Sequence, residues 1–466
     1  MAEPLRREER AVKKKNWEPP ELITRERILK DSGEALALPD IRVKKSEDVF
    51  RIRALEMDWD IGAVVYEPEE SARIPVAPDG KKAGIFLLHG GSGDFKHMER
   101  LSLLLAGKFG YKVLAGTFPG RFYLSDPGRD WPGDTLHPDG TVRTPIWKQG
   151  EPIGADEYEV VRDASMRDRY GTRTLARAKP GSNFYYRMAG WPAAFEEGMR
   201  EANKRHFPVG EYSVYGQGHS TGGPFICMLC QRIPNMAGVL ATEHSPFGYL
   251  CAARDEWGGD MGKVSGYEKV KKKSKPRSDP FHELYIRTWR DRARYAGPEA
   301  LGQEGPTALM RLPALMEDVL DYWERSKKRP NFKAEYIVTH NIVVSLTEAA
   351  KASAARLKMN RDETEALVRR FTGYTRELSG PGVKPVPPVW FCISKDSRDH
   401  SPEVYREVIM PGFQAMKPAP RIALTRFGAG VHVFWNPEKD LPMGIAPAVA
   451  RAWNEAIMGG YFVDQT

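Results

Sequence analysis

The stretch YSVYGQGHSTGGPFICMLC (residues 212–230) joins a strand pattern to a helix pattern through a turn of small residues. YSVYG is an apolar run typical of a buried strand, and the apolar residues after the turn predict a helix. Between them, Ser220 stands between Gly218 and Gly222 at G-x-S-x-G spacing. Glycines at these positions let the chain turn sharply, which would expose the serine hydroxyl at the end of the strand. The spacing alone is a weak signal, so the surrounding sequence must decide whether Ser220 is a nucleophile.

Apolar runs on both sides of this stretch predict further strands of one sheet. They alternate with helix-like pieces such as RLSLLLAGKFG, and they are GIFLLHGG (84–91), YKVLAGTFPG (111–120), MAGVLATEH (236–244), PVWFCISKD (388–396) and RIALTRFGAGVH (421–432). Residues 41–68 alternate between apolar and polar side chains, which predicts two or three antiparallel strands before the first of these runs. The fold class expected is therefore α/β, with a mostly parallel central sheet and helices on both faces. Catalytic groups should gather at the carboxyl ends of the strands.

Two long segments interrupt this alternation and predict the domain organisation. We expect an N-terminal arm at 1–40 and a core formed by 41–250 and 386–466, with an insertion at 120–190. Residues 251–385 contain helix-like stretches such as TALMRLPALMEDVLDYWERS and are expected to form a large, mainly helical cap. Loops of such length are uncommon unless they have a function. A peripheral packing domain is the alternative for this segment.

Composition and charge limit the classes of partner. The chain has 466 residues, a formal net charge of +8 and 41% hydrophobic residues, as a globular protein does. Two basic runs, RREERAVKKK (6–15) and KVKKKSKPR (269–277), read as solvated surface, because no nucleic-acid-binding motif accompanies them. We therefore expect no nucleic-acid partner and no membrane partner. The charged start and the lack of a long apolar run predict a cytoplasmic protein.

The four cysteines give no sign of a metal or redox site. Cys227 and Cys230 form a C-x-x-C pair, but the pair lies in an apolar stretch without a second ligand pair. Buried core thiols are the favoured interpretation, and no metal or cofactor is expected.

The strand, turn and helix around Ser220 resemble the nucleophile elbow of the α/β-hydrolase superfamily. This resemblance implies an oxyanion hole after an earlier strand, and LLHGGSG (87–93) ends such a strand with a His-Gly-Gly sequence. The donors would be the backbone amides of Gly91 and Thr221, with Gly90 beside them. A simple turn is the alternative interpretation of His89-Gly90-Gly91.

The resemblance also implies a histidine base after the last strand. His432 lies there, in the glycine-rich loop RFGAGVHVFWNP, and would take the proton of Ser220. His219, next to the serine, is expected to point away from it. Together with Trp435 it is predicted to line the substrate pocket.

The acid partner of the histidine has three candidates. In the commonest arrangement it follows the strand before the histidine, where CISKDSRDHSPE offers Asp396 and, less well placed, Asp399. Glu243, however, ends the strand after the elbow helix, and an ionised carboxylate beside the serine is costly unless the histidine pairs with it. The sequence is similar here to a group of hydrolases that includes bacterial esterases acting on sulfonylurea herbicides, although EHSPFG matches that group only loosely and the long cap departs from it. Glu243 is our first choice and Asp396 the alternative.

These residues together predict a serine hydrolase that cleaves a carboxylic ester through an acyl-serine intermediate. A C–C bond hydrolase or a lactonase would use the same triad, and a catalytically inactive binding protein on the same scaffold is the alternative of another class. Aromatic and arginine residues in the insertions, as in FYYRMAGW (184–191), favour a small-molecule ester that is aromatic or anionic, but packing within the cap explains them equally well. The cap and the arm would be natural contact surfaces of a homo-oligomer.

Overall fold

A computed structural model describes the sheet, the helices around it and parts of the insertions. The described residues are 17–54, 57–90, 95–118, 153–168, 171–178, 182–220, 222–244, 358–374, 384–397, 405–414 and 418–463, with single positions at 148, 151, 351, 354, 355 and 402. The basic runs, most of the predicted cap and Asp399 lie outside these residues.

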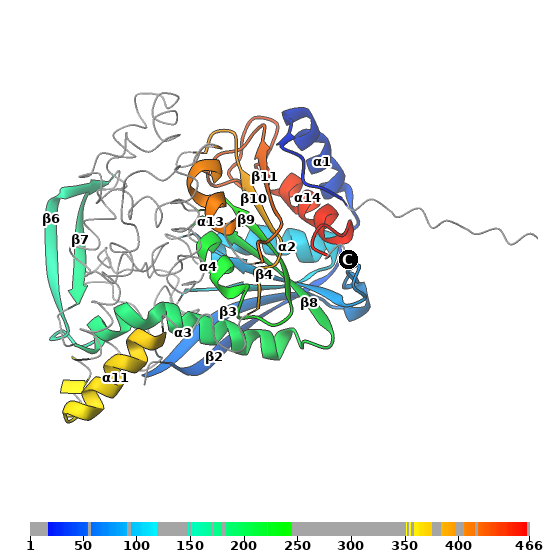
Figure 1. Ribbon diagram of the computed structural model, residues 1–466. Helices are drawn as coiled ribbons and strands as arrows, with labels where there is room; N and C mark the ends of the chain where they lie inside the picture. Colours follow the sequence, from blue (N-terminus) through cyan, green and yellow to red (C-terminus); the bar gives the residue numbers. More distant parts are fainter. Residues whose placement is uncertain are drawn as a thin grey trace, which may run out of the picture.

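A nine-stranded sheet forms the centre of the molecule (Figure 1). In chain order its strands are β1 (Leu22–Ile23), β2 (Val43–Ala54), β3 (Met57–Pro68), β4 (Lys82–Leu88), β5 (Lys112–Gly116), β8 (Tyr212–His219), β9 (Met236–Thr242), β10 (Val389–Ile393) and β11 (Ile422–Phe427). Across the sheet the order is β1-β11-β10-β9-β8-β4-β5-β3-β2. Strand β3 pairs antiparallel with both β2 and β5, and the other described pairs are parallel.

This topology confirms the fold class expected from the sequence. Each predicted apolar run overlaps one strand of the sheet, and residues 41–68 include the antiparallel pair β2–β3. The order from β2 to β11, the reversed β3 and the helix that follows β8 directly are those of the α/β-hydrolase fold. The additional strand β1 extends the sheet beyond β11.

Helices cover both faces of the sheet. The described helices are α1 (Arg25–Ala37), α2 (Phe95–Phe109), α3 (Asn183–His206), α4 (Gly222–Leu229), α11 (Arg361–Tyr374), α13 (Met410–Gln414) and α14 (Ala446–Met458), with a 3-10 turn η1 (Ser71–Arg73) and a π turn η5 (Tyr405–Ile409). Of these, α11 lies away from the sheet (Figure 1). Strand β8 shows how the faces differ, because Tyr215 contacts Trp453 of α14, while Gly216 faces Ile226 of α4. Alternate side chains of the strand therefore enter two different core layers, as the pleat of a strand requires.

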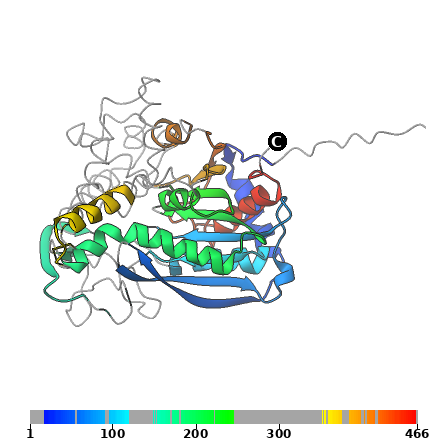
Figure 2. The same ribbon diagram turned by 60° about the horizontal axis from the view of Figure 1, so that its bottom comes forward.

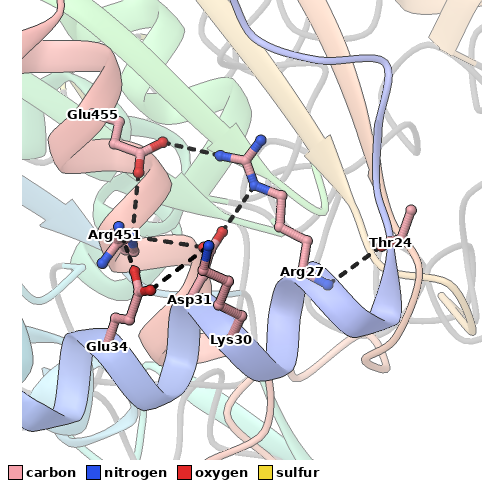
Figure 3. A network of polar contacts seen from close by, with 7 residues as sticks. All are labelled: Thr24, Arg27, Lys30, Asp31, Glu34, Arg451 and Glu455. Carbon is pink, nitrogen blue, oxygen red and sulfur yellow. Dashed lines mark hydrogen bonds and ion pairs between the residues drawn. The ribbon is translucent and has the colours of Figure 1, made fainter.

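The N-terminal segment packs against the last strand and the last helix of the chain. Strand β1 pairs in parallel with β11, and α1 lies beside α14 (Figures 1 and 2). Figure 3 shows the polar contacts at this junction: Asp31, which is buried, accepts from Arg27 of the same helix at 3.1 Å and lies 3.6 Å from Arg451 of α14. Arg27 also reaches Glu455 of α14 at 3.2 Å. Residues 17–37 thus form one edge of the core, whereas residues 1–16 lie outside the described part.

The insertion predicted at 120–190 is described in part. It contains the antiparallel hairpin of β6 (Tyr158–Asp168) and β7 (Gly171–Ala178), and its last residues belong to α3. Helix α3 packs on β2 and β3, where Gly198 leaves room for Ile61. This helix was not predicted from the sequence, because GWPA (190–193) places a glycine and a proline, both helix-weakening residues, within its first half. In the described part of the chain, no helix is long and apolar enough to cross a membrane.

Candidate active site

Ser220 occupies a sharp turn between β8 and α4. Its φ is +53°, in the left-handed region that a residue with a side chain rarely adopts, and its N–H donates to the Thr242 carbonyl at 2.9 Å. The flanking glycines are needed for this turn: a Cβ on Gly218 would collide with the Gly222 carbonyl, and one on Gly222 would lie 2.5 Å from the Leu88 oxygen. The geometry is that of the predicted elbow.

Glu243 follows the last residue of β9, the strand next to the elbow strand. Its N–H donates to the Cys392 carbonyl at 2.8 Å, and its φ is +50°. The side chain is 1% exposed, and its Oε1 accepts the backbone N–H of Ser394 at 2.6 Å. Its Oε2 accepts the hydroxyl of Ser397 and lies 3.4 Å from Nδ1 of His432. A buried carboxylate with these donors is stabilised in its charged form.

His432 lies in the loop after β11, next to the segment that follows β10. The Ser394 hydroxyl donates to the Val431 carbonyl at 2.9 Å, and the N–H of Asp396 donates to the Gly430 carbonyl at 3.0 Å. These bonds tie the histidine loop to the residues that hold Glu243. As a result, side chains that follow β9 and β11 meet at one edge of the sheet.

Asp396, the alternative acid, lies on a different side of the same segment. It is exposed, and no hydrogen bond or ion pair of its carboxylate occurs among the described residues. Its backbone pairs with Val431. The groups of this segment that bond to Glu243 come from its neighbours Ser394 and Ser397. The described geometry therefore brings His432 together with Glu243 and leaves Asp396 facing solvent.

Two predicted pocket residues lie beside His432. The ring of His219 is 5.2 Å from that of His432 and 4.9 Å from that of Trp435, measured between centroids. Phe434 packs against both His219 and Trp435, at 5.3 and 4.8 Å. The side chains of His219 and Trp435 are 3% and 8% exposed, so the two rings form a largely buried aromatic wall next to the elbow.

The predicted oxyanion loop begins beside Ser220. A Cβ on Gly90 would lie 3.3 Å from the Cβ of Ser220, so the loop after β4 approaches the serine closely. The neighbouring His89 is fully buried, and its Nε2 accepts the N–H of Phe118 at 3.1 Å. Gly91 and Thr221, the predicted donors, lie outside the described residues, and their roles stay predictions.

The cysteines near the site are buried and free, as expected for core thiols. Burial raises the pKa of Cys392 well above its ordinary value, and the charge of Glu243 raises it further. Burial likewise raises the pKa of Cys227 far above the usual range and that of Cys230 to about 12. These thiols are therefore protonated near neutral pH and poor nucleophiles. Within the described ranges, no group of His, Cys, Asp and Glu side chains is arranged to hold a metal ion.

The two serines that bond to Glu243 were not predicted from the sequence as part of the site. Ser394 and Ser397 lie in the quoted segment CISKDSRDH, but serines after a strand carry no pattern of their own. One physical signal was available: a buried carboxylate needs donors, and the neighbouring strand end is the nearest source of them.

Comparisons with known proteins give only distant similarities. No family model matches the chain, and no curated protein matches its sequence. Among solved structures, the chain is similar to an esterase of Pyrococcus furiosus, with 10% identity, 92% of this chain and 93% of that chain covered, and a TM-score of 0.35. It is also similar to a haloalkane dehalogenase of Bradyrhizobium elkani (13% identity, 89% and 99% covered, TM-score 0.33) and to an S-formylglutathione hydrolase of Agrobacterium tumefaciens (10% identity, 90% and 100% covered, TM-score 0.34). The assignment of the α/β-hydrolase fold rests on the strand order and on the turn at Ser220.

Proposed function

We propose that the protein is a serine hydrolase that cleaves a carboxylic ester through an acyl-serine intermediate. Ser220 is the nucleophile, His432 the general base and acid, and Glu243 the partner of the histidine. The observation that carries this proposal is the pair of His432 and buried Glu243, 3.4 Å apart, at the sheet edge where Ser220 occupies its turn. A serine hydroxyl needs such a base to become a nucleophile near neutral pH.

The reaction follows from the roles of these groups. The Ser220 oxygen attacks the ester carbonyl while His432 takes its proton through Nε2. The negative charge that develops on the carbonyl oxygen is stabilised by the backbone amides of Gly91 and Thr221. His432 then protonates the leaving alcohol, and a water molecule, activated by the same histidine, releases the acid from the serine.

Glu243 orients the histidine and stabilises its charge. With the carboxylate facing Nδ1, that nitrogen carries the proton and Nε2 is left free to accept from Ser220. The two other donors, from Ser394 and Ser397, hold the carboxylate so that it stays ionised while buried. This arrangement supports our proposal that the chain is related to the esterases with a glutamate acid after the post-elbow strand.

The substrate is proposed to be a small ester that contacts the aromatic wall of His219 and Trp435. The ring of His219 lies 5.2 Å from that of His432, and the rings of Phe434 and Trp435 lie 5.3 and 4.9 Å from that of His219, which suits an apolar or aromatic portion of the substrate. A library of aromatic and aliphatic esters of different acyl length would identify the preferred class.

Labelling with a fluorophosphonate probe tests the proposal. The wild-type protein is expected to be labelled covalently at one serine, and Ser220→Ala is expected to lose the label. The control Ser71→Ala, which changes an exposed serine far from Ser220 in the sequence, is expected to keep it. If the folded wild type takes no label and hydrolyses no ester in the library, the protein is an inactive binding protein on this scaffold and the proposal fails.

A further inference from the structure

The segment after β10 contributes a hydroxyl to the oxygen of Glu243 that faces the histidine. We propose that Ser397 is a positioning residue of the active site: its hydroxyl shares Oε2 of Glu243 with His432 Nδ1 and thereby sets how strongly the carboxylate supports the histidine. This inference rests on the proposed function, because it assigns a role relative to the triad of Ser220, His432 and Glu243.

The two oxygens of Glu243 have different kinds of donor. Oε1 accepts a backbone N–H, that of Ser394 at 2.6 Å, and this donor is fixed by the chain. Oε2 accepts the Ser397 hydroxyl, which can rotate about its C–O bond, and it also lies 3.4 Å from His432. The carboxylate is therefore anchored at one oxygen and adjustable at the other.

Donation by Ser397 lowers the negative charge that His432 meets. A hydrogen bond to a carboxylate oxygen stabilises the anion and reduces the charge available to a second donor on that oxygen. Without the hydroxyl, Oε2 would present more negative charge to His432 and would attract its protonated form more strongly. Since the base must be neutral to accept the proton of Ser220, reaction at acidic pH would become slower.

Titratable groups of β8, β10 and the segment after β10 lie around this pair. Among the described residues, Glu243 lies near His432 and near the Cys392 thiol of β10, whose pKa is raised by burial and by Glu243 itself. His432 also faces His219 of β8, at 5.2 Å between ring centroids. The thiol stays neutral over the working range. The described titratable groups of this region include Glu243, the two histidines, and Lys395 and Asp396, which are exposed and whose backbone N–H groups bond to the loop of His432.

The backbone around Ser397 does not depend on its hydroxyl. The N–H groups of Lys395 and Asp396 donate to the carbonyls of Ala429 and Gly430, at 3.1 and 3.0 Å. Ser397 is only half-buried, so its replacement by alanine removes one oxygen without opening a core cavity. The variant should fold, and its effect should be confined to Glu243 and His432.

The test is the pH dependence of fluorophosphonate labelling, whose second-order rate constant reports the base of the free enzyme without a known substrate. In Ser397→Ala we expect the acid limb of this profile to move to higher pH by about half a unit or more, a loss of roughly threefold in rate on that limb. Ser397→Thr, which keeps the hydroxyl, should restore the wild-type limb, and Ser71→Ala should leave it unchanged. Ser397→Gly, which also lacks the hydroxyl, should behave like alanine.

The inference would be overturned if the acid limb stayed at its wild-type pH in both Ser397→Ala and Ser397→Gly. It would also be overturned if the acid limb of Ser397→Thr moved as far as that of Ser397→Ala. Ser220→Ala separates this failure from that of the proposed function. If Ser220→Ala loses the label while Ser397→Ala keeps the wild-type profile, only the positioning role is wrong. If Ser220→Ala is labelled like the wild type, the triad and the role of Ser397 fail together.

Discussion

Replacing Glu243 by glutamine should reverse the proton arrangement of His432. The donor to Oε1 is the backbone N–H of Ser394, which cannot turn away, so the amide oxygen of a glutamine must take that place. The amide NH₂ then occupies the position of Oε2, 3.4 Å from His432 Nδ1, and donates where the carboxylate accepted. Ser397 can adapt, because its hydroxyl also accepts hydrogen bonds. Nδ1 becomes the acceptor, and the ring proton moves to Nε2.

That tautomer cannot take the proton of Ser220. Loss of the correct tautomer in a triad lowers kcat by about 10³–10⁴-fold, which corresponds to roughly 4–5.5 kcal/mol of transition-state stabilisation. The fold should be nearly unaffected, since the glutamine has almost the same shape and keeps its bond to Ser394. The effect is therefore expected in kcat and in the labelling rate and not in the unfolding midpoint.

The assay compares Glu243→Gln with Asp396→Asn, using an ester hydrolysed by the wild type and the fluorophosphonate rate. Asp396 is exposed and bonds to none of the described residues through its carboxylate, so Asp396→Asn should stay within about twofold of the wild type. A loss of about 10³-fold in Asp396→Asn, with near-normal rates in Glu243→Gln, would refute the assignment of the acid.

Four further predictions concern stability and reactivity. Gln217 in β8 is fully buried, and neither atom of its amide has a hydrogen-bond partner among the described residues, so Gln217→Leu should raise the free energy of unfolding by about 1 kcal/mol or more in urea titrations. Thr425→Val should instead lower it by about 1–3 kcal/mol, because the Trp390 indole N–H, 2.8 Å from the Thr425 hydroxyl, would lose its acceptor; equal effects of the two substitutions would contradict this reasoning. Ser220→Gly should be more stable than Ser220→Ala by about 1 kcal/mol in the same titration, since glycine tolerates the φ of +53°, and both should be unlabelled. In a Cys251→Ser background, a thiol reagent at pH 8 should modify the buried cysteines only after denaturation, since neutral thiols react slowly; fast modification of the native protein would contradict the raised pKa values of Cys227, Cys230 and Cys392.

Most strands of the sheet could be predicted because they coincide with apolar runs in the sequence. Runs such as GIFLLHGG and PVWFCISKD are buried on both faces of the sheet, so their pattern does not depend on the rest of the fold. The positions of Ser220 and His432 after strands could be predicted for a related reason, because each follows such a run within glycine-rich sequence. Strand β1, with two residues, is too short to give a pattern and exists through its pairing with β11.

Which carboxylate lies beside His432 could not be decided from the sequence, because two strands end with a carboxylate near the same edge. Glu243 and Asp396 both follow buried strands, and which side chain turns inward depends on the path of the chain after the last paired residue. The two carboxylates also differ in their hydrogen bonds. Ser394 and Ser397 bond to Glu243, whereas Asp396 is exposed to solvent. These are tertiary contacts between segments about 150 residues apart, and no local pattern records them.

Backbone geometry gives an independent reason to connect Ser220 with Glu243. Each is the first residue after a strand, each donates its N–H to the neighbouring strand, at 2.9 and 2.8 Å, and each then turns through a positive φ. The other non-glycine residues with positive φ in the described chain, Lys358 and Asp440, are exposed, where such a turn disturbs little packing. Strain of this kind is worth about 1–3 kcal/mol per residue, a large share of a typical stability of about 5–15 kcal/mol. Glycine at either position would relieve it, so the side chains present there are explained better by the chemistry proposed for them than by the stability of the sheet.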